Sequence, residues 1–258
     1  MGKAYPRKCQ RVDTTAAPQS PPLHGPNRSP VSCPHPVWIH EQFDRIAPHY
    51  DRLNRVMTLG MEGGWRRKML RGASAPSHAR VLDVCAGTGE LSRLWLEEYP
   101  DASRIVLVDF SEPMLRRAPA KLAIPPAQFV VADALALPFP ADSFDVLLCG
   151  FSLRNLADWR QGIVEMHRVL KPDGQALILE MCKEPWPWPV GFFIKRMVPL
   201  IGRIVSGEAA AYAWLPRSID CFVPAAEVIA EMERVGFREV RRRDMTFRIS
   251  TALAGRKG

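Results

Sequence analysis

Residues 81–180 alternate short apolar runs with amphipathic stretches, and no other feature of the chain narrows its fold as much. The apolar runs have the length of buried strands and cover 81–84, 105–108, 129–132, 144–149 and 176–179. The stretches between them place apolar side chains three or four positions apart, which predicts helices over 90–99, from 113 and over 158–170. Strands that alternate with helices predict an α/β domain built on a parallel sheet.

The segments on either side complete the expected architecture. Helical spacing of apolar residues extends over 37–71, and a proline- and tryptophan-rich insertion at 183–222 is expected to form a helical lid. A further helix is predicted over 225–235. Strands near 237–242 and 246–254 are too close in sequence for a crossover helix, so they are expected to form a hairpin. The expected fold is a mostly parallel seven-stranded sheet with a C-terminal antiparallel hairpin.

The first 37 residues have a composition unlike the rest of the chain. Eight prolines precede Trp38, and proline interrupts both helices and strand ladders. We therefore expect residues 1–37 to be a disordered tail and residues 38–258 to be the folded domain. Of the formal net charge of +8, half lies in the tail, where five Lys and Arg residues accompany one Asp. The basic charge is thus weak evidence for nucleic acid, which we do not expect as a partner.

Cysteine usage and hydropathy point to a cytoplasmic protein. The six cysteines show no CxxC spacing and no Cys/His pairing typical of a metal site, so reduced thiols and no metal are expected. No apolar run approaches the roughly 18 residues that a spanning helix needs. We therefore expect a chain that is neither secreted nor membrane-spanning.

A glycine-rich turn marks the candidate binding site. Residues 81–91 read VLDVCAGTGEL, a strand that runs through Ala86, Gly87, Thr88 and Gly89 into a helix. Glycine lets the backbone approach a ligand closely, and the helix N-terminus offers unpaired N–H groups. Asp109 ends the next strand, where its carboxylate can accept hydrogen bonds from ribose hydroxyls. The pattern predicts a site for a nucleotide-like molecule.

Two molecules fit such a turn. A dinucleotide site would have a third glycine where this chain has Ser92, which counts against an NAD-dependent oxidoreductase. Asp83 and Glu90 flank the turn, and carboxylates repel phosphates but attract the sulfonium and ammonium groups of S-adenosylmethionine. The residues therefore favour S-adenosylmethionine. Asp133, at the end of the third strand, is a candidate acceptor from the adenine amino group, and Met114 a candidate adenine contact, although the two equally suit a turn and a core position.

Four stretches of the sequence are similar to those of a known protein family. They are FDRIAPHYDRLNRVMTLGMEGGWRR at 43–67, VLDVCAGTGEL at 81–91, ADALALPFPADSFDVLLCGFSLRNL at 132–156 and RVLKPDGQALILE at 168–180. With them the chain resembles class I S-adenosylmethionine-dependent methyltransferases and, more narrowly, the ubiquinone/menaquinone biosynthesis C-methyltransferase family, over about 40–254. The resemblance implies a Rossmann-like fold and S-adenosylmethionine as cofactor.

The resemblance places family contacts to this cofactor on Thr88, Asp109, Asp133 and Ala134. The family usually has serine where this chain has Gly150, and here a serine stands two positions later, at Ser152. The turn and the resemblance together give one set of expected cofactor-binding residues: Asp83, Ala86, Gly87, Thr88, Gly89, Asp109, Met114, Asp133, Ala134 and Gly150.

The resemblance also implies methyl transfer to a ring carbon of a reduced, polyprenylated quinone precursor. Such a carbon becomes nucleophilic when the neighbouring hydroxyl loses its proton, so the site needs a proton acceptor and a group that stabilises the phenolate. We expect Arg154 to stabilise the phenolate, with Asn155 and Tyr50 positioning a water that relays the proton. The alternative for Arg154 is a structural ion pair with an acid such as Asp158. A methyltransferase for another lipophilic small molecule is the nearest alternative function, and benzoquinol and naphthoquinol acceptors both stay open.

The insertion suggests a further partner. Residues 186–201 combine aromatic and aliphatic side chains with cations such as Lys195 and Arg196. Such a segment suits a lid over a lipophilic quinol and also suits peripheral contact with the inner face of a membrane. The oligomeric state stays open, a homodimer included.

Overall fold

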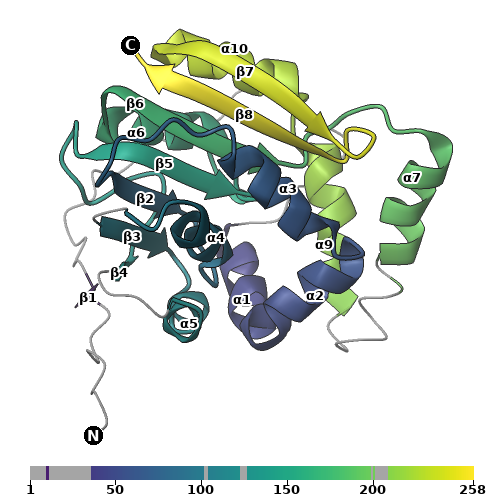
Figure 1. The fold of residues 1–258 in the computed structure, drawn as a ribbon. Coiled ribbons are helices and arrows are strands. Elements are labelled where there is room, and N and C mark those ends of the chain that lie inside the picture. Colours follow the sequence, from purple (N-terminus) through teal and green to yellow (C-terminus); the bar gives the residue numbers. More distant parts are fainter. Residues whose placement is uncertain (1–9, 12–35, 102–103, 123–126, 199, 201–208) are drawn as a thin grey trace, which may run out of the picture.

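A mixed sheet forms the centre of this computed structural model, which describes residues 10–11, 36–101, 104–122, 127–198, 200 and 209–258 (Figure 1). Within these residues the strand order is β1-β4-β3-β2-β5-β6-β8-β7. The strands are β1 (Gln10–Arg11), β2 (Arg80–Val84), β3 (Arg104–Asp109), β4 (Ala127–Val131), β5 (Phe144–Gly150), β6 (Leu170–Glu180), β7 (Phe237–Met245) and β8 (Ser250–Lys257).

The strand directions confirm the expected fold class. The strands from β2 to β6 pair in parallel, and β8 runs antiparallel to both β6 and β7, as predicted for a terminal hairpin. The seven expected strands are all present, and the two-residue β1 adds an eighth beside β4. From β2 the chain first moves outward to β3 and β4 and then returns to β5 on the other side of β2. In open α/β sheets, ligands bind in a crevice at such a reversal, which here corresponds to the carboxyl ends of β2 and β5.

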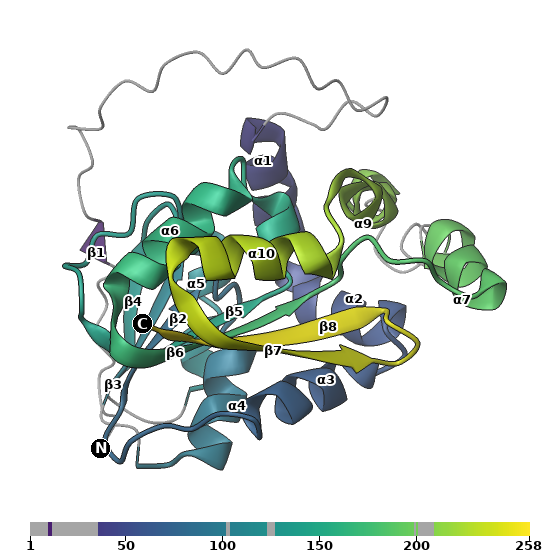
Figure 2. The same ribbon diagram turned by 90° about the horizontal axis from the view of Figure 1, so that it is seen from above.

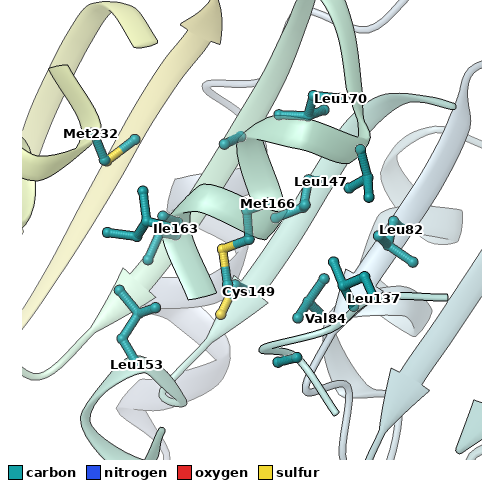
Figure 3. Close-up of a cluster of buried hydrophobic side chains, with 14 of the residues drawn as sticks. Leu82, Val84, Leu137, Leu147, Cys149, Leu153, Ile163, Met166, Leu170 and Met232 are labelled. Atoms are coloured by element: carbon teal, nitrogen blue, oxygen red, sulfur yellow. The ribbon is translucent and has the colours of Figure 1, made fainter. Parts of the chain in front are cut away.

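One face of the sheet packs against α6 (Trp159–Val169) and α10 (Ala225–Val235). Figure 3 shows the buried cluster there, in which Leu82 and Val84 of β2 and Leu147 of β5 lie toward Ile163 and Met166 of α6. Side chains of a strand alternate between the two faces, so Val81 and Asp83 of the same strand point the other way. Both faces of β2 are therefore buried, and the face of Val81 also carries the Asp83 carboxylate.

The opposite face packs against α3 (Met61–Leu70) and α4 (Glu90–Glu98). Trp65 of α3 and Trp95 of α4 lie in this second buried cluster together with Val81 and Leu148. Apolar residues at helical spacing, which predicted these helices, are the residues that bury against the sheet.

The N-terminal helices connect the sheet to the lid. They are α1 (Pro36–Ile46), the short 3₁₀ helix η1 (Ala47–His49) and α2 (Tyr50–Met57). In α1, His40 stacks on Phe110 after β3 with 3.7 Å between ring centroids. Trp38 meets the edge of Trp214, a residue of the lid helix α9 (Ala209–Cys221), at 5.8 Å. These contacts place the helices beside the carboxyl ends of the strands.

The insertion at 183–222 is helical where the structure describes it. It contains α7 (Trp188–Phe192), the π-helix η4 (Phe193–Met197) and α9, while residues 199 and 201–208 lie outside the described residues. In Figure 2 the segment with α7 lies at one end of the molecule, away from β2 and β3. No described helix is long and apolar enough to cross a membrane.

The expected N-terminal tail, residues 1–37, falls mostly outside the described residues. Gln10–Arg11 pairs with β4, and α1 begins at Pro36, two residues before the expected start of the folded domain. The first buried apolar side chain among the described residues is Ile39. Disorder of the tail stays a prediction.

Candidate active site

The glycine turn joins β2 to α4 in a backbone conformation that few residues adopt. Gly87 and Gly89 have φ angles of 55° and 76°, in the left-handed region. A Cβ atom on Gly89 would lie 2.9 Å from the Cβ of Ala118, closer than real Cβ contacts allow. Gly89 therefore has to be glycine for two reasons, its φ angle and the close approach of the segment after α5 (Glu112–Leu115).

Asp109, at the end of β3, braces this turn. Its Oδ2 accepts a hydrogen bond from the backbone N–H of Gly87 at 2.8 Å, and its Oδ1 accepts one from Ser111 N at 2.8 Å. Burial raises the pKa of the Asp109 carboxyl to about 6, although the hydrogen bonds to Ser111 and Gly87 oppose that shift. The acid that was predicted from its spacing therefore also holds the loop in place.

Asp83 lies in β2, just before the turn, and only one of its two carboxylate oxygens accepts hydrogen bonds. Its Oδ2 accepts from Ser92 N at 3.1 Å and from Ser92 Oγ at 2.6 Å, while its Oδ1 is buried with no hydrogen-bond partner among the described residues. Burial raises the pKa of this carboxyl to about 7. Ser92, where a dinucleotide site would have glycine, is thus used to hold Asp83. The unpartnered oxygen is what a site for a cationic ligand would contain.

Thr88 ties α2 to the turn. Its hydroxyl donates to Asp51 Oδ1 at 2.6 Å and accepts from Lys121 Nζ at 2.8 Å, and Lys121 also pairs with Asp51 at 2.6 Å. Arg117 donates to the backbone carbonyls of Ala47 and Pro48, each at 2.7 Å. The helix that carries Tyr50 is therefore fastened to the glycine turn.

The remaining expected cofactor residues have mainly structural contacts. Ala86 N donates to Val108 O at 2.9 Å, and Ala134 is buried. Met114 is only 1% exposed, and Asp133 Oδ1 accepts from Leu135 N at 2.9 Å in a local turn. Their contacts to a cofactor stay predictions.

Arg154 lies on the other side of the crevice, in the 3₁₀ turn η3 (Leu153–Asn155) after β5. Its Nη1 donates to Glu180 Oε1 and, at 2.8 Å, to Phe151 O. Glu180 is fully buried, and Arg154 is 8% exposed at its side chain. Its Nε donates to Ser218 Oγ of the lid helix at 3.3 Å. The guanidinium is thus held in a fixed orientation, with a buried counterion.

The alternative for Arg154, a structural ion pair, is present in the structure, but the acid is Glu180 and not Asp158. Asp158 instead caps α6, because its Oδ1 accepts from the backbone N–H groups of Arg160 and Gln161 at 3.0 and 3.1 Å. The i,i+4 rule applies within a helix, and the chain between Arg154 and Asp158 is a 3₁₀ turn followed by a cap.

Asn155 joins η3 to the lid. Its Oδ1 accepts from the indole N–H of Trp214 at 3.0 Å, and its Nδ2 donates to Phe151 O at 3.3 Å. Asn155 therefore helps to hold α9 against the end of β5. Its predicted role in positioning a water stays a prediction.

Tyr50 lies between the two halves of the crevice. Its Cε1 is 3.9 Å from the position that a Cβ on Gly87 would take. Burial raises the pKa of the Tyr50 hydroxyl, while a hydrogen bond with Asn54 and the charges of Arg66 and Arg154 lower it in part. Tyr50 is thus near the glycine turn and within the electrostatic field of Arg154.

A packing contact explains the glycine at position 150. A Cβ on Gly150 would lie 2.7 Å from Leu91 Cδ1, so a serine there would require the Leu91 side chain to move. Ser152 Oγ donates back to Gly150 O at 2.9 Å. Burial raises the pKa of the Cys85 and Cys149 thiols, and hydrogen bonding with Ser152 opposes this shift. The hydroxyl is therefore present in this region, but from the neighbouring position.

Sequence reasoning missed several residues of the site. They are Asp51, Glu62, Arg66, Lys121, Glu180 and Ser218. Their partners lie in other elements or on the buried side of a helix, and only Glu180, at the carboxyl end of a predicted strand, carried a positional signal. The described residues contain no cluster of His, Cys, Asp and Glu that could hold a metal ion.

Comparison with known proteins adds independent evidence. The model of the ubiE/COQ5 methyltransferase family matches residues 34–257. A demethylmenaquinone methyltransferase of Deinococcus radiodurans is 42% identical over 233 residues, covering 85% of this chain and 92% of that protein. A ubiquinone/menaquinone biosynthesis C-methyltransferase UbiE of Geobacter sulfurreducens is 39% identical over 227 residues, covering 85% of this chain and 88% of that protein.

Among solved structures, a SAM dependent methyltransferase from Aquifex aeolicus is similar, with a TM-score of 0.55 and 18% identity. The match covers 75% of this chain and 89% of the Aquifex chain. At this identity the likeness concerns the fold alone. It agrees with the Rossmann-like class I fold that the sequence motifs implied.

The raised pKa of Asp83 predicts how stability depends on pH. Between pH 4 and about pH 7 the folded state binds more protons than the unfolded state, so the free energy of unfolding falls as the pH rises. Asp83→Asn removes this contribution. Between pH 6 and 7.5 the wild type should lose on the order of 1 kcal/mol relative to the variant, measured by urea denaturation.

Asp145→Asn is the matched control. Burial raises the pKa of Asp145, but the hydrogen bonds from Lys171 and from the backbone of Arg80, together with the charges of these two residues, outweigh burial and lower the pKa, so its titration lies below this pH range. Equal slopes for wild type and Asp83→Asn between pH 6 and 7.5 would contradict the assignment.

Proposed function

The chain belongs to the ubiE/COQ5 methyltransferase family, and from that premise we propose that it methylates a ring carbon of a polyprenylated quinol in menaquinone or ubiquinone biosynthesis, with S-adenosylmethionine as methyl donor. The family model spans nearly all of residues 38–258, the expected folded domain. Relatives that carry the names demethylmenaquinone methyltransferase and ubiquinone/menaquinone biosynthesis C-methyltransferase cover 85% of the chain and support this reaction.

The residues around the glycine turn fit S-adenosylmethionine. When bound, this cofactor supplies a methyl group activated by a sulfonium. Asp83 offers a buried carboxylate oxygen without a partner, which suits a positive group, and a phosphate would be repelled there. Asp109 keeps acceptor capacity beyond its two backbone hydrogen bonds, as a contact with ribose hydroxyls requires.

The position of Tyr50 is the observation that carries the proposal. Its Cε1 lies 3.9 Å from the position that a Cβ on Gly87 would take, beside the turn where the donor would be held, and the charge of Arg154, which would stabilise an acceptor oxygen, helps to lower the Tyr50 pKa. In this proposal donor and acceptor meet beside Tyr50, which supplies the proximity that the reaction needs.

Arg154 stabilises the phenolate in this proposal. Its Nη1 and Nε hydrogen bonds to Glu180, Phe151 O and Ser218 fix the plane of the guanidinium, and the described residues give Nη2 no partner. A donor fixed in advance stabilises developing negative charge without reorganising. The guanidinium stays protonated, so it does not serve as the base.

The proton leaves through a relay. A water held by Tyr50 and Asn155 takes the proton of the acceptor's hydroxyl and passes it to solvent. Because burial raises the pKa of Tyr50, its hydroxyl stays protonated at neutral pH and donates a hydrogen bond to that water. Asn155 already accepts from Trp214, and its oxygen has a second lone pair for that water. The contact with Trp214 also holds the lid helix α9 against the turn after β5.

An assay of the purified enzyme tests the reaction. Methyl transfer from labelled S-adenosylmethionine is measured with a short-chain prenylated benzoquinol and with the matching naphthoquinol, each kept reduced. We expect a C-methylated product from at least one of them, identified by mass spectrometry. No product from either quinol would refute the proposed function, and a product from one alone would name the acceptor ring.

Arg154 is the residue whose change should separate chemistry from cofactor binding. Arg154→Lys keeps a cation beside Glu180 but loses the planar fork, so we expect kcat to fall about 100-fold or more, the usual effect of losing a fixed oxyanion donor. The Kd for S-adenosylmethionine, measured by calorimetry, should change less than about threefold.

Arg160→Lys on the exposed face of α6 is the matched control, since Arg160 pairs only at distances of 3.7 and 3.9 Å. Arg154→Ala is the stronger change, but it leaves Glu180 buried without its counterion, so thermal unfolding must accompany it. Nearly full turnover in a folded Arg154→Lys or Arg154→Ala variant would remove Arg154 from the mechanism.

We also propose that the lid segment 186–201 contacts the inner face of a membrane. Trp188 and Phe192 of α7 are 79% and 50% exposed and stack with 5.8 Å between centroids. Leu59 and Phe247 are also exposed, and in both views their segments, the α2–α3 junction and the β7–β8 turn, lie at the same end as α7 (Figure 1, Figure 2). Exposed aromatic side chains beside cations suit an anionic lipid surface.

The β7–β8 turn is firmly held in this arrangement. Thr246, Phe247 and Arg248 have φ angles of 40°, 53° and 63°. The indole N–H of Trp65 donates to Thr246 Oγ1 at 2.8 Å, and that of Trp186 donates to Arg248 O at 3.0 Å. Two tryptophans thus join α3, the hairpin and the start of the insertion.

Flotation with vesicles of phosphatidylcholine and phosphatidylglycerol tests the membrane contact. Trp188→Ser with Phe192→Ser should lower vesicle binding at least about tenfold, because each aromatic side chain contributes about 1.5–3 kcal/mol when buried. Deletion of residues 1–35 is the control, since the basic tail is the competing explanation. Equal flotation of the wild type and the double variant would exclude the segment.

A further inference from the structure

Gln42 is a buried polar residue to which the mechanism above gives no role. It lies on α1, where the residue is only 5% exposed, and its Oε1 is buried with no hydrogen-bond partner among the described residues. A buried amide oxygen without a partner costs free energy that an apolar side chain of the same size would not cost. The hydrogen-bond donor of a ligand is therefore the candidate partner of this oxygen.

One side of α1 meets the donor half of the site. His40 stacks on Phe110, with 3.7 Å between the ring centroids, and Asp44 Oδ1 accepts a hydrogen bond from Ser111 Oγ at 2.5 Å. Phe110 and Ser111 directly follow β3, which ends with Asp109. This side of the helix is thus fixed to the segment that follows the donor-binding acid.

Gln42 lies on the other side of α1. It follows His40 by two residues, which places the two on opposite sides of a helix, and it follows Trp38 by four, which places those two on one side. The ring of Trp38 meets the edge of Trp214 on α9, and the Trp214 indole N–H donates to Asn155 Oδ1 at 3.0 Å. Gln42 is therefore on the side of α1 toward the lid helix and the turn η3, which form the acceptor half.

Aromatic side chains surround this position. Phe43, the next residue, has its ring centroid 6.1 Å from that of Tyr50, and Trp38 and Trp214 pack together on the side of α9. A hydroxylated aromatic ring suits such surroundings, because it packs against other rings and brings the donor that Gln42 lacks.

A quinol has two hydroxyls, on opposite sides of the ring, and the reaction treats them differently. The hydroxyl beside the reacting carbon loses its proton, and Arg154 stabilises the resulting oxygen in the proposed mechanism. The other hydroxyl keeps its proton and needs an acceptor when it is buried. An amide oxygen accepts from a hydroxyl but repels a phenolate oxygen, so it distinguishes the two ends of the ring.

We propose that Oε1 of Gln42 accepts a hydrogen bond from the second hydroxyl of the quinol, the one that keeps its proton, and thereby sets the orientation in which the ring binds. This inference rests on the proposed function, because it takes a quinol as the acceptor. Gln42 is a specificity residue: it directs the other oxygen of the ring, next to the reacting carbon, toward Arg154.

Calorimetric titration in the presence of S-adenosylhomocysteine tests the contact without turnover, because this demethylated form of the donor has no methyl group to transfer. One ligand is a short-chain prenylated quinol, kept reduced. The other is the matching phenol, which keeps the hydroxyl beside the reacting carbon and has hydrogen in place of the second. Gln42→Met should raise the Kd of the quinol about 5- to 100-fold, the range for leaving a buried polar group unpaired. The Kd of the phenol should change less than about threefold.

The stability of the free protein gives a second readout. Because Oε1 has no partner among the described residues, Gln42→Met removes an unpaired buried oxygen, so the Tm without ligands should stay the same or rise. A glutamine that the fold itself requires would give a lower Tm instead, and that result would overturn the inference.

Gln161→Met on α6 is the matched control, since it makes the same exchange at an exposed position and should change neither Kd. Gln42→Leu carries the comparison if Gln42→Met does not fold, and failure of both to fold would show a structural role. An equal loss for quinol and phenol would overturn the contact, as would an unchanged Kd for the quinol. A weaker Kd for S-adenosylmethionine alone would place Gln42 in the donor half and would also overturn it.

The wild type separates this inference from the proposed function. If it methylates no prenylated quinol, the proposed function fails. If it methylates a quinol but binds the quinol and the phenol equally well, only the contact with Gln42 fails.

Discussion

A carboxylate buried at the end of a strand must be given hydrogen bonds by whatever follows it, and this requirement organises the whole edge of the sheet. The Asp83 carboxylate accepts two hydrogen bonds from Ser92, in the first turn of α4. The Asp109 carboxylate accepts a hydrogen bond from the backbone N–H of Gly87 in the glycine turn. The Glu180 carboxylate, at the end of β6, accepts hydrogen bonds from the Arg154 guanidinium and from the backbone N–H of Met181. Asp109 and Glu180 each hold the loop of a neighbouring strand as well as their own loop, whereas Asp83 holds the helix that follows its own strand.

These acids differ in what they leave over for a ligand. Glu180 is paired with a guanidinium and serves to orient it. Asp109 is occupied by backbone N–H groups on both oxygens but retains lone pairs. Asp83 keeps one oxygen without any partner. The acid on the β6 side therefore has a structural role, and the acid on the β2 side has an oxygen available for a ligand. This arrangement agrees with the proposal that cations hold the acceptor and carboxylates hold the donor.

Periodicity and spacing predicted much of this molecule. The strands, the terminal hairpin and the helices on both faces follow from alternation of apolar residues, and the position of Asp109 follows from its distance to Gly89. The contacts between elements could not be predicted from periodicity or spacing. The partner of Arg154 is 26 residues away in sequence at Glu180, and the acid four residues on is used as a helix cap. Likewise the close approach of Leu91, whose Cδ1 lies 2.7 Å from where a Cβ on Gly150 would be, is seen only in the fold.

The fastening of α2 to the glycine turn links the two sides of the proposed site through one residue. Asp51 is held both by the hydroxyl of Thr88 and by Lys121, and the next residue toward the N-terminus is Tyr50. Because Asp51 is bonded to the turn, the position of Tyr50 relative to the turn is set by the backbone between two adjacent residues.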